Sequence, residues 1–238
     1  MCTVSFYRDS QNIIITHNRD EHVNRPIAIP PKKILLDDGF LFCPIDPKSQ
    51  GTWFVVKNEG NVMVLLNGAE SKHIPSSYYR KSRGLILLEL ASYKNLIEAW
   101  IQIELIDIEP FTLVAFYNHQ LYQFRWNGLK KSSNTLNSEI AHIWSSSTLY
   151  SPEIRQIREN WFSDFLRLKK TNEDDFLAFH STKNDAQNGL IINRNQTILT
   201  KNITQCILTK NHFKLKHFDL INEEKSEINE SIKAQFYS

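Results

Sequence analysis

The chain of 238 residues has few glycines, few cysteines and little net charge, and each shortage argues against a class of protein. Its seven glycines include no closely spaced set, and Gly84, Gly128 and Gly189 stand isolated, so a phosphate-binding glycine-rich loop is not expected. The formal net charge is only +2, with basic and acidic residues interspersed. Bulk electrostatics therefore gives no reason to expect nucleic acid as a partner.

The three cysteines, Cys2, Cys43 and Cys206, are an odd number and show no metal-ligand spacing. A chain of this size buries enough surface to fold without disulfides, so we predict free thiols in a reducing compartment. The histidines form no pair four residues apart with a carboxylate between them, which argues against a zinc site. We expect no metal.

Long apolar runs are also absent. No stretch is long enough to span a bilayer, and the chain does not start with a cationic segment followed by an apolar one. We therefore predict a cytoplasmic protein without a membrane span. Hydrophobic residues make up 41% of the chain and aromatic residues 11%, which are globular values. One domain is expected over residues 1–222, followed by a polar tail at 223–238 that forms a surface helix or a frayed end.

The apolar residues alternate in some segments and recur at helical spacing in others. Strand pairs are predicted at 4–7 with 13–16, at 53–56 with 62–66 and at 204–208 with 212–218, and further strands at 111–117, 120–126 and 141–147. Helices are predicted at 82–93, 95–106, 152–169 and 174–179. An α+β fold that stacks sheets under helices accommodates this order in one domain.

Cys2 is the residue with the clearest chemical potential. An initiator methionine that precedes a small residue is usually removed, and this would leave Cys2 with both a thiol and a free α-amine. An α-amine titrates at about 7.7–8.0 and a thiol at about 8.5, so the amine can accept the thiol proton near neutral pH. The alternative is that Cys2 is a small apolar residue at the start of a buried strand.

Six short segments along the first 90 residues occur in the order found in one protein family. They are Met1-Cys2-Thr3, Asn18-Arg19-Asp20-Glu21 with Arg25-Pro26, Asp46 with Gly51-Thr52-Trp53, Asn58-Glu59-Gly60, Leu66-Asn67, and Ser82-Arg83-Gly84. With these segments the chain resembles the transport and Golgi organisation protein family, also called the NRDE family. The resemblance is specific up to residue 90 and becomes scattered from about residue 110.

The resemblance implies a relation to the N-terminal-nucleophile hydrolases with a cysteine nucleophile, and with it a four-layer αββα sandwich. It also implies that Arg19 lowers the pKa of the Cys2 thiol and that Asp20 orients the Cys2 amine. Neighbours in a regular strand point to opposite faces, so either a bulge redirects one of them or only one contacts Cys2. The alternative is an ion cluster of Arg19, Asp20, Glu21 and Arg25 at a strand end.

The same resemblance implies two donors for the oxyanion of an acyl-transfer reaction. Asn67, at the end of a buried strand, matches the first donor, and its alternative role is to terminate that strand. Ser147 stands where the hydrolases have the second donor, an asparagine. Lys201 is the candidate for a late arginine of the hydrolase pattern, although the segment around it, Thr200-Lys201-Asn202, does not match that pattern.

Two functions follow as hypotheses from the resemblance. The first is an amidohydrolase or acyltransferase that acts on a carbon–nitrogen amide bond of a small molecule, with Cys2, Arg19, Asp20, Asn67 and Ser147 in the site and no cofactor required. The second is a non-catalytic carrier that binds haem or a lipid or acyl ligand in the same cleft, with Cys2 or a histidine as an axial ligand to haem. The state of the N-terminus and the formation of an acyl-enzyme distinguish them.

Overall fold

The computed structural model describes residues 2–167 and 171–232. In these residues the chain forms two antiparallel sheets, each of seven strands, and four helices. In the first sheet the order is β10 (His142–Ser145), β1 (Cys2–Arg8), β2 (Ile13–His22), β12 (Ile198–Leu208), β13 (His212–Asp219) and β14 (Glu224–Ser231), with β11 (Asn193–Arg194) also paired to β12. In the second sheet the order is β3 (Ile29–Leu36), β4 (Gly39–Ile45), β5 (Phe54–Lys57), β6 (Val62–Asn67), β7 (Phe111–Tyr117), β8 (Gln120–Trp126) and β9 (Lys131–Leu136).

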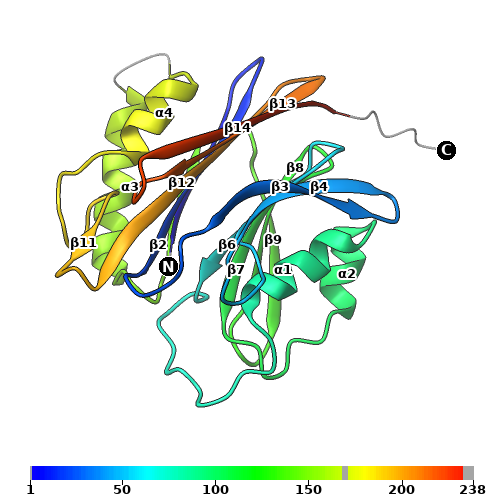
Figure 1. Ribbon diagram of the computed structural model, residues 1–238, viewed down its shortest axis with the longest axis horizontal. Helices are drawn as coiled ribbons and strands as arrows, with labels where there is room; N and C mark the ends of the chain where they lie inside the picture. The colour runs from blue at the N-terminus through cyan, green and yellow to red at the C-terminus, as the bar shows by residue number, and fades with distance from the viewer. Residues whose placement is uncertain (1, 168–170, 233–238) are drawn as a thin grey trace.

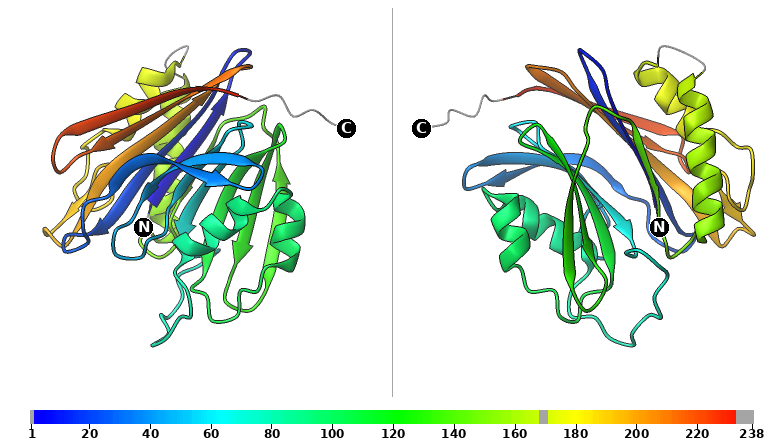
Figure 2. Two further views of the ribbon diagram at one scale, coloured as in Figure 1. Left: turned by 45° about the vertical axis from the view of Figure 1, so that its right-hand side comes forward. Right: turned by 180° about the vertical axis from the view of Figure 1, so that it is seen from behind.

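The helices cover the outer faces of the two sheets. Helices α1 (Arg83–Ser92) and α2 (Leu96–Gln102) lie on the second sheet, and α3 (Pro152–Arg167) and α4 (Glu173–His180) lie on the first (Figures 1 and 2). The layers therefore follow the order helix, sheet, sheet, helix. This confirms the predicted α+β fold, an αββα sandwich. No helix in the described residues is long and apolar enough to cross a membrane.

Side chains alternate between the two faces of the central strands, so these strands contribute to two separate hydrophobic cores. Val4, Phe6 and Ile15 point between the sheets and join the main hydrophobic core, whereas Ile14 and Ile207 point outward and pack with Phe162 of α3 and Phe176 of α4. A central strand of this sandwich is covered on both faces, which explains why residues 2–6 are all buried. Cys2 belongs to the inward-pointing set.

Most predicted elements are present within a few residues of their predicted bounds. The predicted helix 152–169 is α3, and residues 168 and 169 lie outside the described residues. The predicted polar tail was wrong from 224 to 231, because these residues form β14, which pairs with β13 along its whole length. Residues 233–238 of the predicted tail lie outside the described residues. The strands β3, β4, β9 and β11 were not predicted.

Candidate active site

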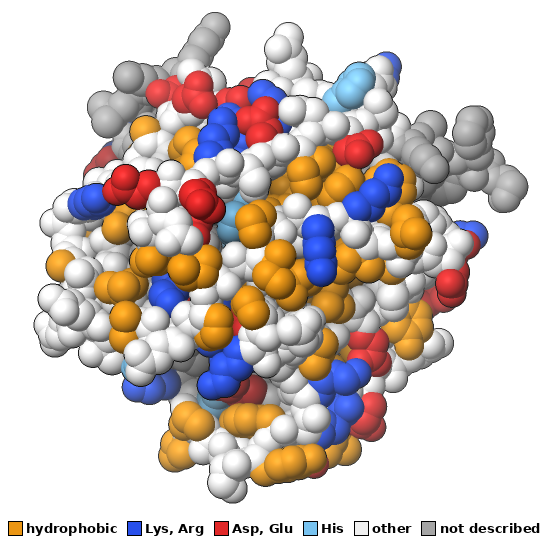
Figure 3. Space-filling model, viewed as in Figure 1, with side chains coloured by type: hydrophobic (Ala, Val, Ile, Leu, Met, Phe, Trp, Pro, Cys, Tyr) orange, Lys and Arg blue, Asp and Glu red, His pale blue; other side chains and the backbone are white. Residues whose placement is uncertain are grey.

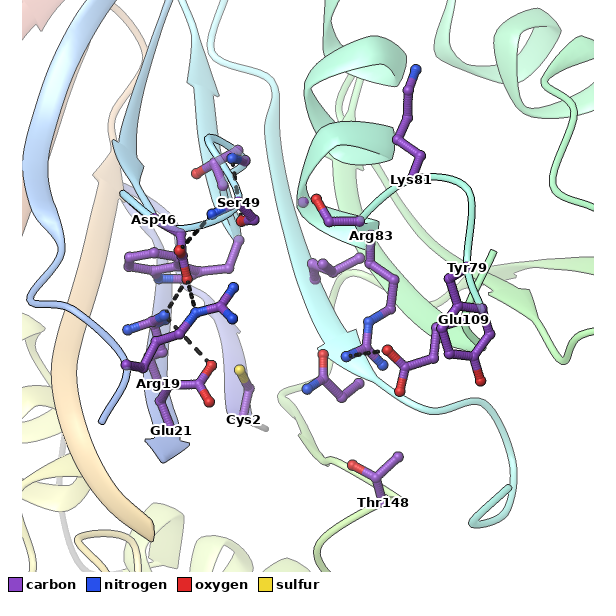
Figure 4. A pocket seen from close by; sticks show the side chains of 18 of the residues that line it. Cys2, Arg19, Glu21, Asp46, Ser49, Tyr79, Lys81, Arg83, Glu109 and Thr148 are labelled. Atoms are coloured by element: carbon purple, nitrogen blue, oxygen red, sulfur yellow. Dashed lines mark hydrogen bonds and ion pairs between the residues drawn. The ribbon is translucent and has the colours of Figure 1, made fainter. Parts of the chain in front are cut away.

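Cys2 lies at the floor of a cavity of about 610 Å³ between the two sheets. The first sheet contributes Cys2, Arg19 and Glu21 to this Cys2 cavity, and β6 of the second sheet contributes Asn67. Figure 4 shows the thiol of Cys2 between one wall that carries Arg19, Glu21 and Asp46 and an opposite wall that carries Arg83 and Glu109. The site therefore needs both sheets, and each contributes through residues at or near strand ends.

Strand register places Arg19 beside Cys2. The two Cα atoms are directly opposite each other in the β1–β2 pair, so their side chains share the inner face of the sheet. The guanidinium is held rigidly: Nη2 donates to Asp46 Oδ2 at 2.6 Å and lies 3.5 Å from Glu21 Oε2, and the group stacks 4.3 Å from the centre of the Trp53 ring. Its Nη1 is buried and has no partner among the described residues. One donor of Arg19 is therefore unused beside the nucleophile.

The thiol of Cys2 is 4% exposed, and burial raises its pKa. The negative charge of Asp20 raises the pKa further, whereas the positive charge of Arg19 lowers it. Arg19 therefore acts in the direction predicted from the sequence, although burial dominates. All three cysteines in the described residues are free and buried. Burial also raises the pKa of Cys43 to about 12 and that of Cys206 above its usual range.

Asp20 points away from the Cys2 cavity, towards the layer of α3 and α4. Its Oδ2 accepts a hydrogen bond from the hydroxyl of Tyr150 at 2.9 Å, and its Oδ1 accepts one from Thr200 Oγ1 at 2.7 Å. Complete burial raises the pKa of Asp20, and these two bonds oppose that increase. The guanidinium of Arg158 stacks 4.1 Å from the centre of the Tyr150 ring and adds positive charge behind the carboxylate.

Arg19 and Asp20 thus point to opposite faces of β2, as neighbours in a regular strand do, and only Arg19 faces the thiol. The irregularity in this region lies in β12, between Thr200 and Asn202, and not at residues 18–21. The proposed ion cluster is also present in part, because Asp46 accepts from both Arg19 and Arg25, the latter at 2.8 Å from Nε. Asp20 is not a member of that cluster.

Asn67 lines the Cys2 cavity at the end of β6, as the sequence predicted. Its backbone carbonyl accepts a hydrogen bond from Ser146 Oγ at 2.7 Å, while the backbone N–H of Ser146 donates to the Cys2 carbonyl at 2.9 Å. Ser146 therefore fixes β6 against β1. Within the described residues no hydrogen bond uses the side-chain amide of Asn67, which leaves its N–H donors available to a ligand.

The geometry argues against the predicted roles of Ser147 and Lys201. Ser147 lines a separate cavity of about 80 Å³, and its Oγ donates to the carbonyl of Ser71 at 3.2 Å. Its neighbour Thr148 lines the Cys2 cavity instead. Lys201 does not line the cavity, because its Nζ donates to the carbonyls of Val23 and Arg25.

Two sequence segments that had no assigned role, around Gly51 and Gly84, meet beside the Cys2 cavity. A Cβ on Gly51 would lie 2.6 Å from the carbonyl carbon of Gly84, and one on Gly84 would lie 2.8 Å from the carbonyl oxygen of Thr52, so neither position tolerates a larger residue without movement. This close approach sets the start of α1 against the cavity. Arg83 then lines it, with Nη2 at 2.9 Å from Glu109 Oε2.

A family model for Transport and Golgi organisation 2 matches residues 1–235. The chain belongs to this family. No curated protein matches the chain. Among solved structures it is similar to the Caenorhabditis elegans orthologue of N-acylethanolamine-hydrolyzing acid amidase, with 12% identity over 86% of this chain and 92% of that one and a TM-score of 0.59.

A second similar structure is an arginine-to-leucine variant of conjugated bile acid hydrolase from Clostridium perfringens. It shares 10% identity over 99% of this chain and 97% of that one, with a TM-score of 0.52. Identities this low establish the fold alone. The family match and the sandwich architecture therefore confirm the family resemblance and the fold that the sequence indicated.

Proposed function

We propose that this protein is an N-terminal-cysteine amidohydrolase that cleaves a carbon–nitrogen amide bond of a small molecule. The observation that carries the proposal is the arrangement around Cys2: a thiol on the first strand opens into a cavity of about 610 Å³, with a guanidinium on one side and an unused amide donor on the other. A nucleophile, a fixed positive charge and a donor for an oxyanion are the elements that acyl transfer requires.

The mechanism requires Cys2 to become N-terminal through removal of Met1. The α-amine of Cys2 then accepts the thiol proton, and the thiolate attacks the carbonyl carbon of the amide. Asn67 Nδ2 donates to the oxygen on which negative charge develops, and this stabilises the transition state. As the carbon–nitrogen bond breaks, the protonated α-amine returns the proton to the leaving amine. Water then hydrolyses the thioester, which releases the carboxylic acid and restores the thiol.

Arg19 and Asp20 have different tasks in this mechanism. Arg19 faces the sulfur and opposes the effect of burial on the thiol pKa. Asp20 lies behind the strand, where Tyr150 and Thr200 hold its carboxylate in one orientation. Its predicted action on the amine of Cys2 stays a prediction.

The carrier hypothesis receives less support from the walls of the cavity. Five Lys and Arg residues and three carboxylates line it. The flat apolar ring of haem is ordinarily enclosed by apolar and aromatic side chains. His73 is the one histidine among the described residues that line the cavity, and its Nε2 lies 3.3 Å from Glu109 Oε1. The charged lining fits a polar amide better than a porphyrin.

A cytoplasmic site of action is part of the proposed function.

The test is hydrolysis of a panel of activated amides, together with a haem titration of the same protein. We expect product formation that Cys2→Ala abolishes and that Cys206→Ala, a matched change of a buried cysteine away from the cavity, leaves intact. Absence of any Cys2-dependent product, together with a saturable Soret shift on addition of haem, would refute the hydrolase and favour the carrier.

A further inference from the structure

Positive charge exceeds negative charge in the Cys2 cavity. Its lining contains Arg19, Arg25, Lys72, Lys81 and Arg83, against the carboxylates of Glu21, Asp46 and Glu109. Figure 3 shows Lys and Arg side chains around a hollow in the lower third of the face seen there. A cavity with an excess of one sign of charge raises the local concentration of ligands of the opposite sign.

The excess lies on the wall formed by α1 and the preceding loop. On the opposite wall, Arg19 and Arg25 share Asp46, and Glu21 lies within reach of Arg19, so the charges there are largely compensated. On the α1 wall, Glu109 serves both Arg83 and His73. Lys81 Nζ is paired with Glu89 Oε2 at 2.5 Å, so Lys72 is the side chain in the described lining of this wall whose charge is left uncompensated. The Nζ of Lys72 forms no hydrogen bond or ion pair with the described residues.

The start of α1 adds to this positive wall. Ser82, Arg83 and Gly84 line the cavity, and the first turn of the ten-residue helix contains no acidic residue to offset the positive end of its dipole. On the opposite wall of the cavity, two buried donors also lack partners among the described residues: Arg19 Nη1 and Trp53 Nε1. Both side chains are at most 5% exposed. A ligand with acidic oxygen atoms matches this surplus of donors and charge.

We propose that the small-molecule amide bound at Cys2 carries one carboxylate, which is held against Arg83, Lys72 and the start of α1. This inference rests on the proposed hydrolase function for the identity of the bond that is cleaved, but not for binding. The carboxylate belongs either to the amine portion or to the acyl portion of the amide. In both cases it forms charge-assisted hydrogen bonds with Arg83 and an ion pair with Lys72.

Binding is measured first, by calorimetry with the Cys2→Ala protein at low ionic strength. N-Hexanoylglycine and its neutral glycinamide analogue test a carboxylate on the amine portion; the monopropylamide of glutaric acid and its neutral diamide analogue test one on the acyl portion. We expect the acidic member of one pair to bind at least about tenfold more tightly than its neutral partner. The preference should weaken as salt is added.

Variants locate the charge that is responsible. Lys72→Ala changes an exposed side chain, so it should fold, and it should remove most of the preference for the acidic member. Arg83→Met should do the same, and Arg83→Lys should restore part of it. Lys130→Ala, a matched change of an exposed lysine outside the cavity, should have no effect.

The outcomes separate this inference from the proposed function. A preference that depends on Lys72 and Arg83, without turnover by the unsubstituted enzyme, supports the carboxylate site and contradicts the hydrolase. Equal binding of the acidic and neutral members in both pairs overturns the carboxylate site, even where amides are cleaved. An Arg83→Met protein that binds the acidic and the neutral member more weakly by the same factor also overturns it.

Discussion

Replacement of Tyr150 by Phe tests how the carboxylate of Asp20 is held. The substitution keeps the ring that stacks on Arg158 and removes only the hydroxyl that donates to Asp20 Oδ2 at 2.9 Å. A buried hydrogen bond to a charged group contributes about 1.5–3 kcal/mol, whereas one between neutral groups contributes about 0.5–1.5 kcal/mol. We therefore expect a loss of about 1.5–3 kcal/mol in the free energy of unfolding when Asp20 is ionised.

The pH dependence of this loss has a definite sign. Because burial raises the pKa of Asp20 in the folded state, its contribution to stability is fully present below the pKa of the unfolded chain and is lost as pH rises through the folded value. Without the hydroxyl of Tyr150 the folded pKa rises further, so the difference between the two proteins should grow with pH.

Urea unfolding of both proteins at several pH values measures this difference. Tyr122→Phe is the matched control, because the hydroxyl of Tyr122 has no hydrogen bond in the described residues. The hydroxyl does not stabilise the Asp20 carboxylate if Tyr150→Phe lowers the free energy of unfolding equally at low and high pH. The same conclusion holds if the decrease is no larger than that of the control.

Three further predictions concern residues around the site. Arg19→Met should raise the pH midpoint for alkylation of Cys2 and Asp20→Asn should lower it, because their charges shift the thiol pKa in opposite directions. Midpoint shifts of the same sign would contradict these opposite effects. Asn67→Ala should slow acylation of Cys2 by roughly a hundredfold or more while ligand affinity changes little, as single-turnover kinetics would reveal. Burial lowers the pKa of His217 to about 4, so the neutral side chain contributes stability above about pH 6.5 that is lost as pH falls. In His217→Gln, the free energy of unfolding should therefore change less with pH between about pH 6.5 and 4, by up to about 1.4 kcal/mol per pH unit. An unchanged slope in that range would refute this.

The sequence predicts elements well where apolar periodicity is strong. Strands β7 and β8 begin and end at the predicted residues, since both lie in the core of the second sheet. Strand β14 was missed because it is an edge strand, with Ile228 as its only large apolar residue and with charged residues that face solvent. Strand β3 was missed because Pro30 and Pro31 are ordinarily read as breakers, although an edge strand tolerates them.

Site residues that lie on or at the end of predicted strands could be placed from the sequence. Cys2 and Arg19 follow from a hairpin register, and Asn67 follows from the end of a buried strand. Arg83 could not be placed, because its position depends on the contact between Gly51 and Gly84, which are remote in sequence. Tyr150 gave no sequence signal, since an aromatic residue in a loop is ordinarily assigned to the core.

The central claim, that Cys2 is an N-terminal nucleophile, is tested most directly by the intact mass of the protein from its native source, before and after reaction with an electrophilic amide or β-lactone. We predict a mass that lacks Met1 and a single adduct that maps to Cys2, with Cys43 and Cys206 unlabelled because burial raises the pKa of both thiols. Complete retention of Met1, or an adduct on another cysteine with none on Cys2, would contradict it.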